Sequence, residues 1–252
     1  FSGGLWWDPA AQIYKMWYRC GGAQCLATSH DGIKWDKPLD IHPAGSALAK
    51  TNIVDDRLFD GSTIWLDLRP EVPAEERYKM AVVCEVSCSH YTLKYSGDGV
   101  NWRTMLNMTG PTSDRATIFF NPFRSKWVFS IKTGFAAKDA TGKWGGPYNL
   151  GRSRKYWDGD DLVKAGGKTR DHRWHLSCIL PRAPAMIVRT GYTPDQPVNW
   201  TSADFLDPDV GCLSSAGNSF TQLYNLDAVA YESVLVGLFS IFTGKECGRM
   251  CN

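Results

Sequence analysis

Short apolar segments recur along the chain and are separated by turn residues such as Gly, Asp and Pro, a pattern that predicts β-strands joined by tight hairpins. The first group of predicted strands covers residues 5–9, 13–20, 26–29 and 33–35, and the second covers 63–66, 78–84, 91–96 and 100–102. A third group covers 116–120, 126–131, 148–154 and 198–200, and a fourth begins with 223–232 and 234–242. The pattern therefore predicts an all-β protein.

Two short sequence motifs recur in the same order, which indicates that these groups of strands are copies of one unit. Tyr14-Lys-Met16 and Tyr78-Lys-Met80 lie 64 residues apart, and Ser29-His-Asp-Gly-Ile-Lys-Trp35 recurs as Ser96-Gly-Asp-Gly-Val-Asn-Trp102 after 67 residues. A repeat of this length with four strands is typical of β-propeller blades. We expect each Asp-Gly pair to form a type I′ hairpin and each Trp to pack back on its blade.

The repeats also predict the domain organisation. The 252 residues hold about three and a half blades, whereas β-propellers have at least about four. We therefore expect one β-propeller domain over residues 1–252 that is incomplete within this sequence, which begins at Phe1 as a fragment or processed product would. Residues 155–197 are expected to be a long irregular insertion in the third blade.

Polar residues at the head of each blade's first strand are the candidates for chemistry. When the repeats are aligned by their ends, Asp60, Asp114 and Asn225 occupy one position, and Asp227 lies two residues on, on the same side of its strand. The heads of first strands converge near a propeller axis, so three carboxylates are expected to face one cavity. The alternative is that Asp60 and Asp114 only cap turns. Asp227 lies within an apolar run, where an unpaired carboxylate is costly to bury.

Aromatic residues and arginines complete the expected pocket. Aromatics make up 13% of the chain, with 11 Trp, and their planar faces suit both strand packing and stacking on sugar rings. Arg152 and Arg154 lie two apart on a predicted strand and are expected to be exposed on its surface; the alternative is that they face one side and bind a carboxylate. The predicted substrate contacts are Trp6, Trp65, Arg115, Phe119 and Asn225.

Charge and periodicity argue against several other classes of protein. The 28 Lys and Arg and 26 Asp and Glu are scattered and give a net charge of +2, which argues against nucleic acid or an anionic membrane as the partner. No apolar run of about 18 residues predicts a membrane-spanning helix. His172 and His175 allow a weak metal-site alternative, but no further ligands accompany them, so neither a metal nor a cofactor is predicted.

The eight cysteines favour an oxidising compartment. Cys20–Cys25, Cys84–Cys88 and Cys247–Cys251 are the predicted disulfides, the first two across hairpins. Asn107-Met-Thr109 and Asn199-Trp-Thr201 are glycosylation sequons. We expect a secreted or extracellular protein; a cytoplasmic protein with buried thiols is the alternative.

Several words spread over the chain resemble the five-bladed β-propeller glycosidases, the superfamily of glycoside hydrolase families 32, 43 and 68, and more closely bacterial family 32-like proteins. The words stand at residues 1–6, 15–18, 27–35, 121–124 and 224–232. The resemblance implies five blades of four antiparallel strands. It also implies three acidic residues at strand heads: a nucleophile or base, a general acid, and one that stabilises the transition state or tunes a neighbouring pKa. By position these are Asp60, Asp114 and Asp227. The family 32 nucleophile word Trp-Met-Asn-Asp-Pro-Asn-Gly and its Arg-Asp-Pro word are absent.

The predicted function is therefore hydrolysis of an oligo- or polysaccharide by paired carboxylates. One carboxyl group protonates the leaving oxygen, and the other attacks carbon or activates water. The alternative is a non-catalytic carbohydrate-binding or scaffold β-propeller, because a fold does not determine a function.

Overall fold

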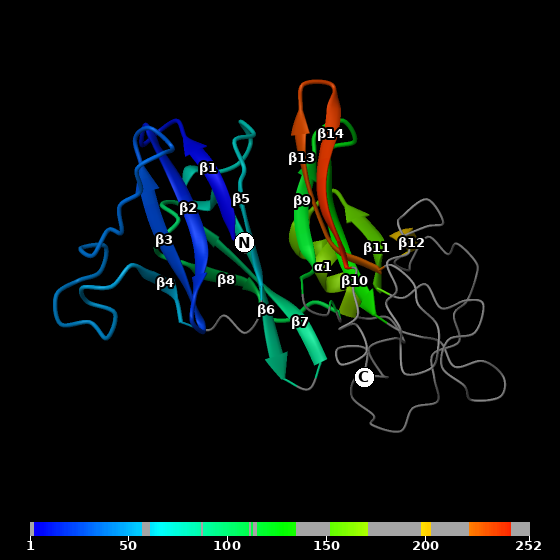
Figure 1. Cartoon of the computed structure of the whole chain (residues 1–252), viewed down its shortest axis with the longest axis horizontal. Coiled ribbons are helices and arrows are strands. Elements are labelled where there is room, and N and C mark those ends of the chain that lie inside the picture. The colour runs from blue at the N-terminus through cyan, green and yellow to red at the C-terminus, as the bar shows by residue number, and fades with distance from the viewer. Residues whose placement is uncertain are drawn as a thin grey trace. The chain divides into compact units, whose positions relative to one another are not determined.

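The computed structural model describes residues 3–56, 61–86, 88–110, 112, 115–134, 152–170, 198–202 and 222–242. Almost all regular structure in these residues is β, accompanied by one α-helix and one short 3-10 helix (Figure 1). The chain forms two compact units, residues 1–109 and 110–252, which are described separately. The prediction of an all-β protein is confirmed.

The first unit consists of two four-stranded antiparallel sheets in which strand order follows the sequence. The short 3-10 helix η1 (Ala74–Glu76) precedes β6. The first sheet contains β1 (Gly4–Asp8), β2 (Ile13–Cys20), β3 (Ala23–Ser29) and β4 (Ile53–Asp55). The second sheet contains β5 (Ser62–Leu66), β6 (Tyr78–Val86), β7 (Cys88–Ser96) and β8 (Arg103–Leu106).

Apolar side chains from both sheets of the first unit form one core. Trp17 and Tyr78 are fully buried, and their rings meet edge to face with centroids 5.3 Å apart. Such an aromatic pair contributes about 0.5–1.5 kcal/mol beyond the burial of its surface. The first strands also touch, because the Gly3 amide donates to the Ser62 carbonyl (2.9 Å) and the Ile64 amide donates to the Gly3 carbonyl (3.0 Å). The two sheets therefore pack with β1 beside β5.

The two Ser-x-Asp-Gly words form the same turn. The Ser29 hydroxyl oxygen accepts a hydrogen bond from the amide of the following glycine (2.8 Å), and Asp31 Oδ1 accepts from the next two amides (2.8 Å each). Ser96 and Asp98 make the equivalent bonds at 2.9 Å and 2.8 Å. The prediction of a type I′ turn is wrong, because that turn needs a positive φ at both central residues, and only the glycines have one, at 73° and 79°.

This turn explains why the fourth strands lie later in the chain than predicted. Residues 33–35 and 100–102 are not strands. The backbone amides at the start of each segment are bound by an Asp side chain, which withholds them from a sheet. Ile33 is accordingly 81% exposed. The strands that complete the two sheets are β4 and β8 instead.

The second unit contains a four-stranded antiparallel sheet and a two-stranded ribbon. In the sheet, β9 lies at one edge and the order is β12-β11-β10-β9. The side chains of Ile118, Phe119 and Phe120 on β9 are all buried, as predicted for a first strand covered on both sides. The strands are β9 (Thr117–Asn121), β10 (Lys126–Gly134), β11 (Arg152–Gly159), β12 (Val198–Ser202), β13 (Gln222–Tyr231) and β14 (Val234–Phe242).

The third strand of this sheet lies later than the predicted 148–154. β11 continues to Gly159, so the excursion from the sheet begins after that residue rather than at 155. The helix α1 (Leu162–Arg170) follows, which the sequence reasoning did not predict. Asp161 Oδ1 accepts a hydrogen bond from the Lys164 amide (2.8 Å) and so caps the start of the helix.

The ribbon of β13 and β14 lies against the sheet, with β13 beside β9 (Figure 1). Its register shifts once: Leu223 pairs with Ile241 and Asn225 pairs with Ser240. Tyr224 is therefore one extra residue on β13, a β-bulge. A bulge changes which way the following side chains point, so this one helps to set the direction of the strand residues after it.

The outer part of the ribbon exposes apolar side chains. Val229 and Tyr231 are 42% and 64% exposed, so the expected burial of this first strand does not hold for them. Leu238 on β14 is 75% exposed. Among the described residues, β13 is the only strand paired with β14.

Cys20 and Cys25 form the predicted disulfide across the turn between β2 and β3. The other two predicted pairs, Cys84–Cys88 and Cys247–Cys251, involve side chains outside the described part of the structure. A helix long and apolar enough to cross a membrane is absent from the described residues.

Candidate functional site

The middle of β13 brings together Asn225 and Asp227, both of which the sequence predicts as site residues; because β13 begins at Gln222, they lie further along the strand than the predicted head. They lie two positions apart on one strand, and Asn225 Nδ2 donates a hydrogen bond to Asp227 Oδ2 (3.2 Å). The other amide atom of Asn225, Oδ1, is buried without a hydrogen-bond partner among the described residues. Asp227 itself is exposed. The pair therefore presents a carboxyl group to solvent with an amide beside it.

The surroundings of Asp227 favour the protonated form of its carboxyl group. Desolvation by the protein packed around this carboxyl raises its pKa above the usual aspartate value. The Asn225 hydrogen bond, the charge of Arg154 and the Thr117 hydroxyl each lower the pKa, but together they do not offset the desolvation. Asp227 is thus both accessible and biased towards holding a proton, which are the properties of a general acid.

Arg154 on β11 is fully buried, so the prediction that it lies exposed on a strand surface is wrong. Its guanidinium group donates hydrogen bonds to the carbonyls of Arg115 (2.7 Å), Tyr224 (2.6 Å) and Ser130 (3.4 Å). These carbonyls come from the turn two residues before β9, the bulge of β13 and the middle of β10. The planar fork of a guanidinium can serve several acceptors at once, which accounts for an arginine at this buried position.

The carbonyl of Leu226, directly before Asp227, is also bound by side chains of the sheet. The Thr117 hydroxyl donates to it at 2.9 Å and the Ser130 hydroxyl at 3.3 Å. Lys132, which is buried, places its ammonium group 5.5 Å from the centre of the Tyr224 ring. The strand that carries Asp227 is therefore attached to β9, β10 and β11 by side chains rather than by a backbone ladder.

The remaining predicted residues of the second unit take different places. Asp114, like Asp60 of the first unit, lies outside the described residues. Arg115 adopts a left-handed backbone conformation (φ 55°), and its carbonyl accepts the bond from Arg154. Phe119 is 2% exposed, and its ring centre lies 6.3 Å from that of Trp200, so it packs within the sheet and presents no open face to a ligand.

Trp6 and Trp65, the aromatic contacts predicted in the first unit, lie together. Their rings pack edge to face with centroids 4.7 Å apart, and Trp6 Nε1 donates to the Ile64 carbonyl (2.7 Å). Both side chains are partly exposed. The pair joins β1 to β5 and leaves part of each indole accessible.

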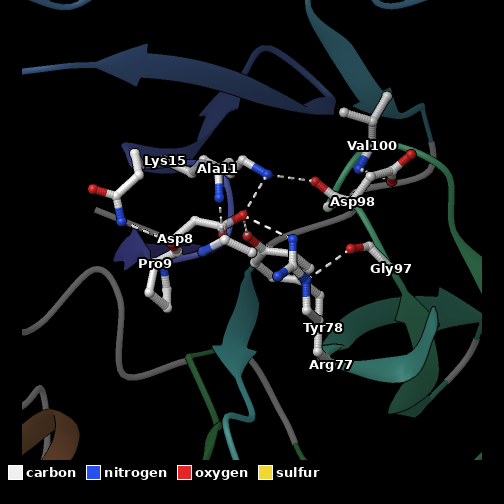
Figure 2. A network of polar contacts seen from close by, with 12 residues as sticks. Asp8, Pro9, Ala11, Lys15, Arg77, Tyr78, Gly97, Asp98 and Val100 are labelled. Carbon is white, nitrogen blue, oxygen red and sulfur yellow. Dashed lines mark hydrogen bonds and ion pairs between the residues drawn. The ribbon is translucent and has the colours of Figure 1, made fainter. Parts of the chain in front are cut away.

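A buried charge cluster at the end of β1 was not predicted as a unit. Figure 2 shows Lys15, Arg77 and Tyr78 converging on Asp8, which is fully buried. Asp8 Oδ2 accepts hydrogen bonds from Lys15 Nζ (2.9 Å), the Arg77 guanidinium (3.0 Å) and the Tyr78 hydroxyl (2.5 Å). Its Oδ1 accepts from the amides of Ala10 (3.0 Å) and residue 11 (3.2 Å).

The cluster around Asp8 connects the two sheets of the first unit and is not suited to acid–base chemistry. Burial acts to raise the pKa of Asp8, but the hydrogen bonds from Tyr78 and Lys15 outweigh it and lower the pKa to about 2. Lys15 also donates to the Asp98 carbonyl (2.8 Å), and Arg77 donates to the Gly97 carbonyl (2.9 Å). A carboxylate with five donors and no exposed surface has no free lone pair to offer a substrate.

Metal chemistry gains no support from the described residues, in which no three His, Cys, Asp or Glu side chains form a metal-binding group. His172 and His175 lie outside the described residues. No protein-family model matches the chain, and no curated protein matches it.

Proposed function

We propose that the chain is part of a carbohydrate-active hydrolase in which Asp227 is the general acid. The observation that carries this proposal is the carboxyl group of Asp227 in the middle of β13, which is accessible to solvent and has a raised pKa. A raised pKa favours the protonated carboxyl group, and such a group can give its proton to the oxygen of a glycosidic bond as it breaks. Asn225, beside it, is positioned to orient the carboxyl group or a sugar hydroxyl.

The fold proposed for this enzyme is a five-bladed β-propeller of which the sequence holds about three and a half blades. Three sheets with four antiparallel strands each, the repeated Ser-x-Asp-Gly turn and the contact of β1 with β5 support it. In this interpretation β13 and β14 are the first two strands of a further blade. The placement of β13 beside β9 is consistent with two first strands that neighbour each other.

The second carboxylate of the reaction is proposed from the sequence alone, and Asp60 and Asp114 are the candidates. It would attack the sugar carbon or activate water while Asp227 protonates the leaving oxygen. A separation of about 5 Å between the two carboxyl groups leads to retention of configuration, and about 6.5–9.5 Å leads to inversion. The exposed edges of Trp6 and Trp65 are proposed to contact sugar rings. The Cys20–Cys25 disulfide supports an extracellular location.

The test is release of reducing sugar from a panel of oligo- and polysaccharides by the wild-type chain, Asp227→Asn and a control, Asp160→Asn. Asp160 is an acidic residue of the same unit that is exposed and paired with Lys126. We expect Asp227→Asn to lose at least about a hundredfold in kcat, while the control and the folding of both variants are unchanged.

Equal activity of Asp227→Asn and wild type would exclude the assigned role. Binding on a glycan array without sugar release from any ligand would favour the alternative, a non-catalytic carbohydrate-binding propeller.

A further inference from the structure

We propose that Arg154 is the positioning residue of this site: its guanidinium group fixes the bulge of β13 against the neighbouring sheet and thereby sets where the Asp227 carboxyl group lies. This inference rests on the proposed function only in giving Asp227 a catalytic role. The geometry that carries it consists of hydrogen bonds from one buried side chain to three strands.

The bulge at Tyr224 is the feature that needs a partner. Because Tyr224 is the extra residue in the pairing of β13 with β14, its carbonyl lies outside the regular ladder at the register shift. Arg154 donates to that carbonyl at 2.6 Å. A buried carbonyl without a donor is costly, so the arginine stabilises the bulged backbone over a regular one.

The direction of the Asp227 side chain depends on this bulge. Side chains alternate between the two faces of a strand, so removing or adding one residue of register sends all following side chains to the opposite face. Asn225 and Asp227 follow Tyr224 by one and three residues. If the bulge relaxed, both would turn away from the face they occupy.

The guanidinium group of Arg154 also binds two backbone carbonyls of the sheet, those of Ser130 and Arg115. Ser130 is fully buried in the middle of β10, and Arg115 lies two residues before β9 with its backbone in the left-handed region (φ 55°). A non-glycine residue in that conformation is maintained only where surrounding contacts determine it. The bond to Arg154 at 2.7 Å is one such contact. Arg154 thus links the bulge of β13 to the carbonyls of Ser130 and Arg115 on the neighbouring sheet.

Two variants separate the geometry of Arg154 from its charge. Arg154→Lys keeps a positive charge but cannot reproduce the planar fork, and Arg154→Gln loses both. If Arg154 positions Asp227, both variants lose about a hundredfold in kcat, because a displacement of about 1 Å has that effect, with a smaller change in KM. Arg124→Gln, at a surface ion pair on the same sheet, is the control and keeps wild-type kinetics.

A measurement without substrate accompanies the kinetics. The pKa of Asp227 is followed by carbon NMR of the side-chain carboxyl group in chain labelled at aspartate. Among the described side chains, the charged group that acts on this carboxyl group is Arg154 on β11. We expect the Asp227 carboxyl resonance to change its shift in both variants because the group is displaced, and its pKa to rise in Arg154→Gln because the cation is gone.

The outcomes distinguish this inference from the proposed function. Folded Arg154 variants with wild-type kcat and an unchanged Asp227 resonance would overturn the positioning role, even if Asp227→Asn is inactive. Wild-type activity in Asp227→Asn would overturn the proposed function, whereas the NMR result would still test the positioning. If both arginine variants unfold, Thr117→Val replaces them; it removes the bond from the Thr117 hydroxyl to the Leu226 carbonyl, together with the effect of that hydroxyl on the pKa of Asp227. That variant is expected to shift the Asp227 resonance and lower kcat about fivefold; wild-type values of both would refute the inference that bonds from the sheet to β13 position Asp227.

Discussion

Replacing Asp8 by Asn is the sharpest test of how the first unit is held together. The substitution keeps the size of the side chain, and Asn Oδ1 can still accept from the amides of Ala10 and residue 11. The atom that replaces Oδ2, however, is an NH₂ group facing three donors, those of Lys15, Arg77 and Tyr78. The substitution thus removes the negative charge and leaves two cations without their buried partner.

The magnitude of the effect follows from two independent arguments. Removing one member of a buried ion pair costs about 3–5 kcal/mol. The low pKa of Asp8, about 2 against a reference of 3.8, corresponds to about 2.5 kcal/mol of extra stabilisation of its charged form, at about 1.4 kcal/mol for each pH unit. The side chains of Lys15 and Arg77 keep 11% and 20% of their exposure, so water partly screens them. We expect a loss of about 3 kcal/mol at pH 7.

The pH dependence gives the prediction a second signature. A carboxyl group whose pKa is lower in the folded than in the unfolded protein stabilises the fold above the unfolded pKa of about 3.9. That stabilisation is lost as the pH falls through the folded value of about 2. Wild type is therefore expected to lose stability from Asp8 between about pH 4 and pH 2, and Asp8→Asn lacks this part of the dependence.

Urea unfolding followed by tryptophan fluorescence measures both quantities, because Trp17 in the same core reports on this unit. Asp40→Asn, at an exposed aspartate of the first unit, is the matched control and should change stability by no more than about 0.5 kcal/mol. A loss below about 1 kcal/mol in Asp8→Asn, or identical pH profiles for it and wild type, would show that the cluster does not stabilise the fold as argued.

Two further predictions concern single positions. Gly99 has φ 79°, and a Cβ there would lie 2.4 Å from the buried Trp17 ring, whereas Gly21 has φ 68° and open space around it. In urea unfolding, Gly99→Ala should therefore lower the free energy of unfolding by about 1–3 kcal/mol more than Gly21→Ala. Equal losses in the two variants would contradict the packing argument. Leu238 on β14 is 75% exposed. Leu238→Lys should therefore reduce any concentration-dependent self-association seen by sedimentation, while Tm stays near the wild-type value. A large fall in Tm would show that Leu238 is packed in solution.

The sequence predicted most of the strands because their signal is local. The boundaries of β2 and β14 agree with the predicted 13–20 and 234–242, and the two sheets of the first unit follow the repeat. The fourth strands were misplaced because Ser and Asp side chains bind the amides that a strand would need. The helix α1 was missed because Gly166-Gly167 gives its sequence a low helix propensity.

The candidate site was predictable only in part. Asp227 and Asn225 were found because a carboxylate and an amide at period two interrupt an apolar run. Arg154 was missed because its role depends on carbonyls that come from residues far apart in the sequence, at 115, 130 and 224. The bulge at Tyr224 could not be predicted from the sequence, because no Gly or Pro next to Tyr224 marks a break in the strand. Local patterns thus predict a candidate acidic group, whereas the contacts of Arg154 can be read only from the folded chain.

The carboxyl ends of the first strands share a local hydrogen-bond pattern in three of the copies. At the carboxyl ends, Asp8 binds the amides two and three residues further on, and Asn121 does the same with the amides of residues 123 and 124. Asp67 binds the amide of residue 69 (3.4 Å). In these three copies the residue at the end of the strand binds an amide two residues further on, which indicates that it closes the turn. Asp227 lies within its strand rather than at such a turn. In the sequence, Asp60, Asp114 and Asn225 share one aligned position and Asp227 follows two residues on, so these are the positions at which we expect the chain to carry its chemistry.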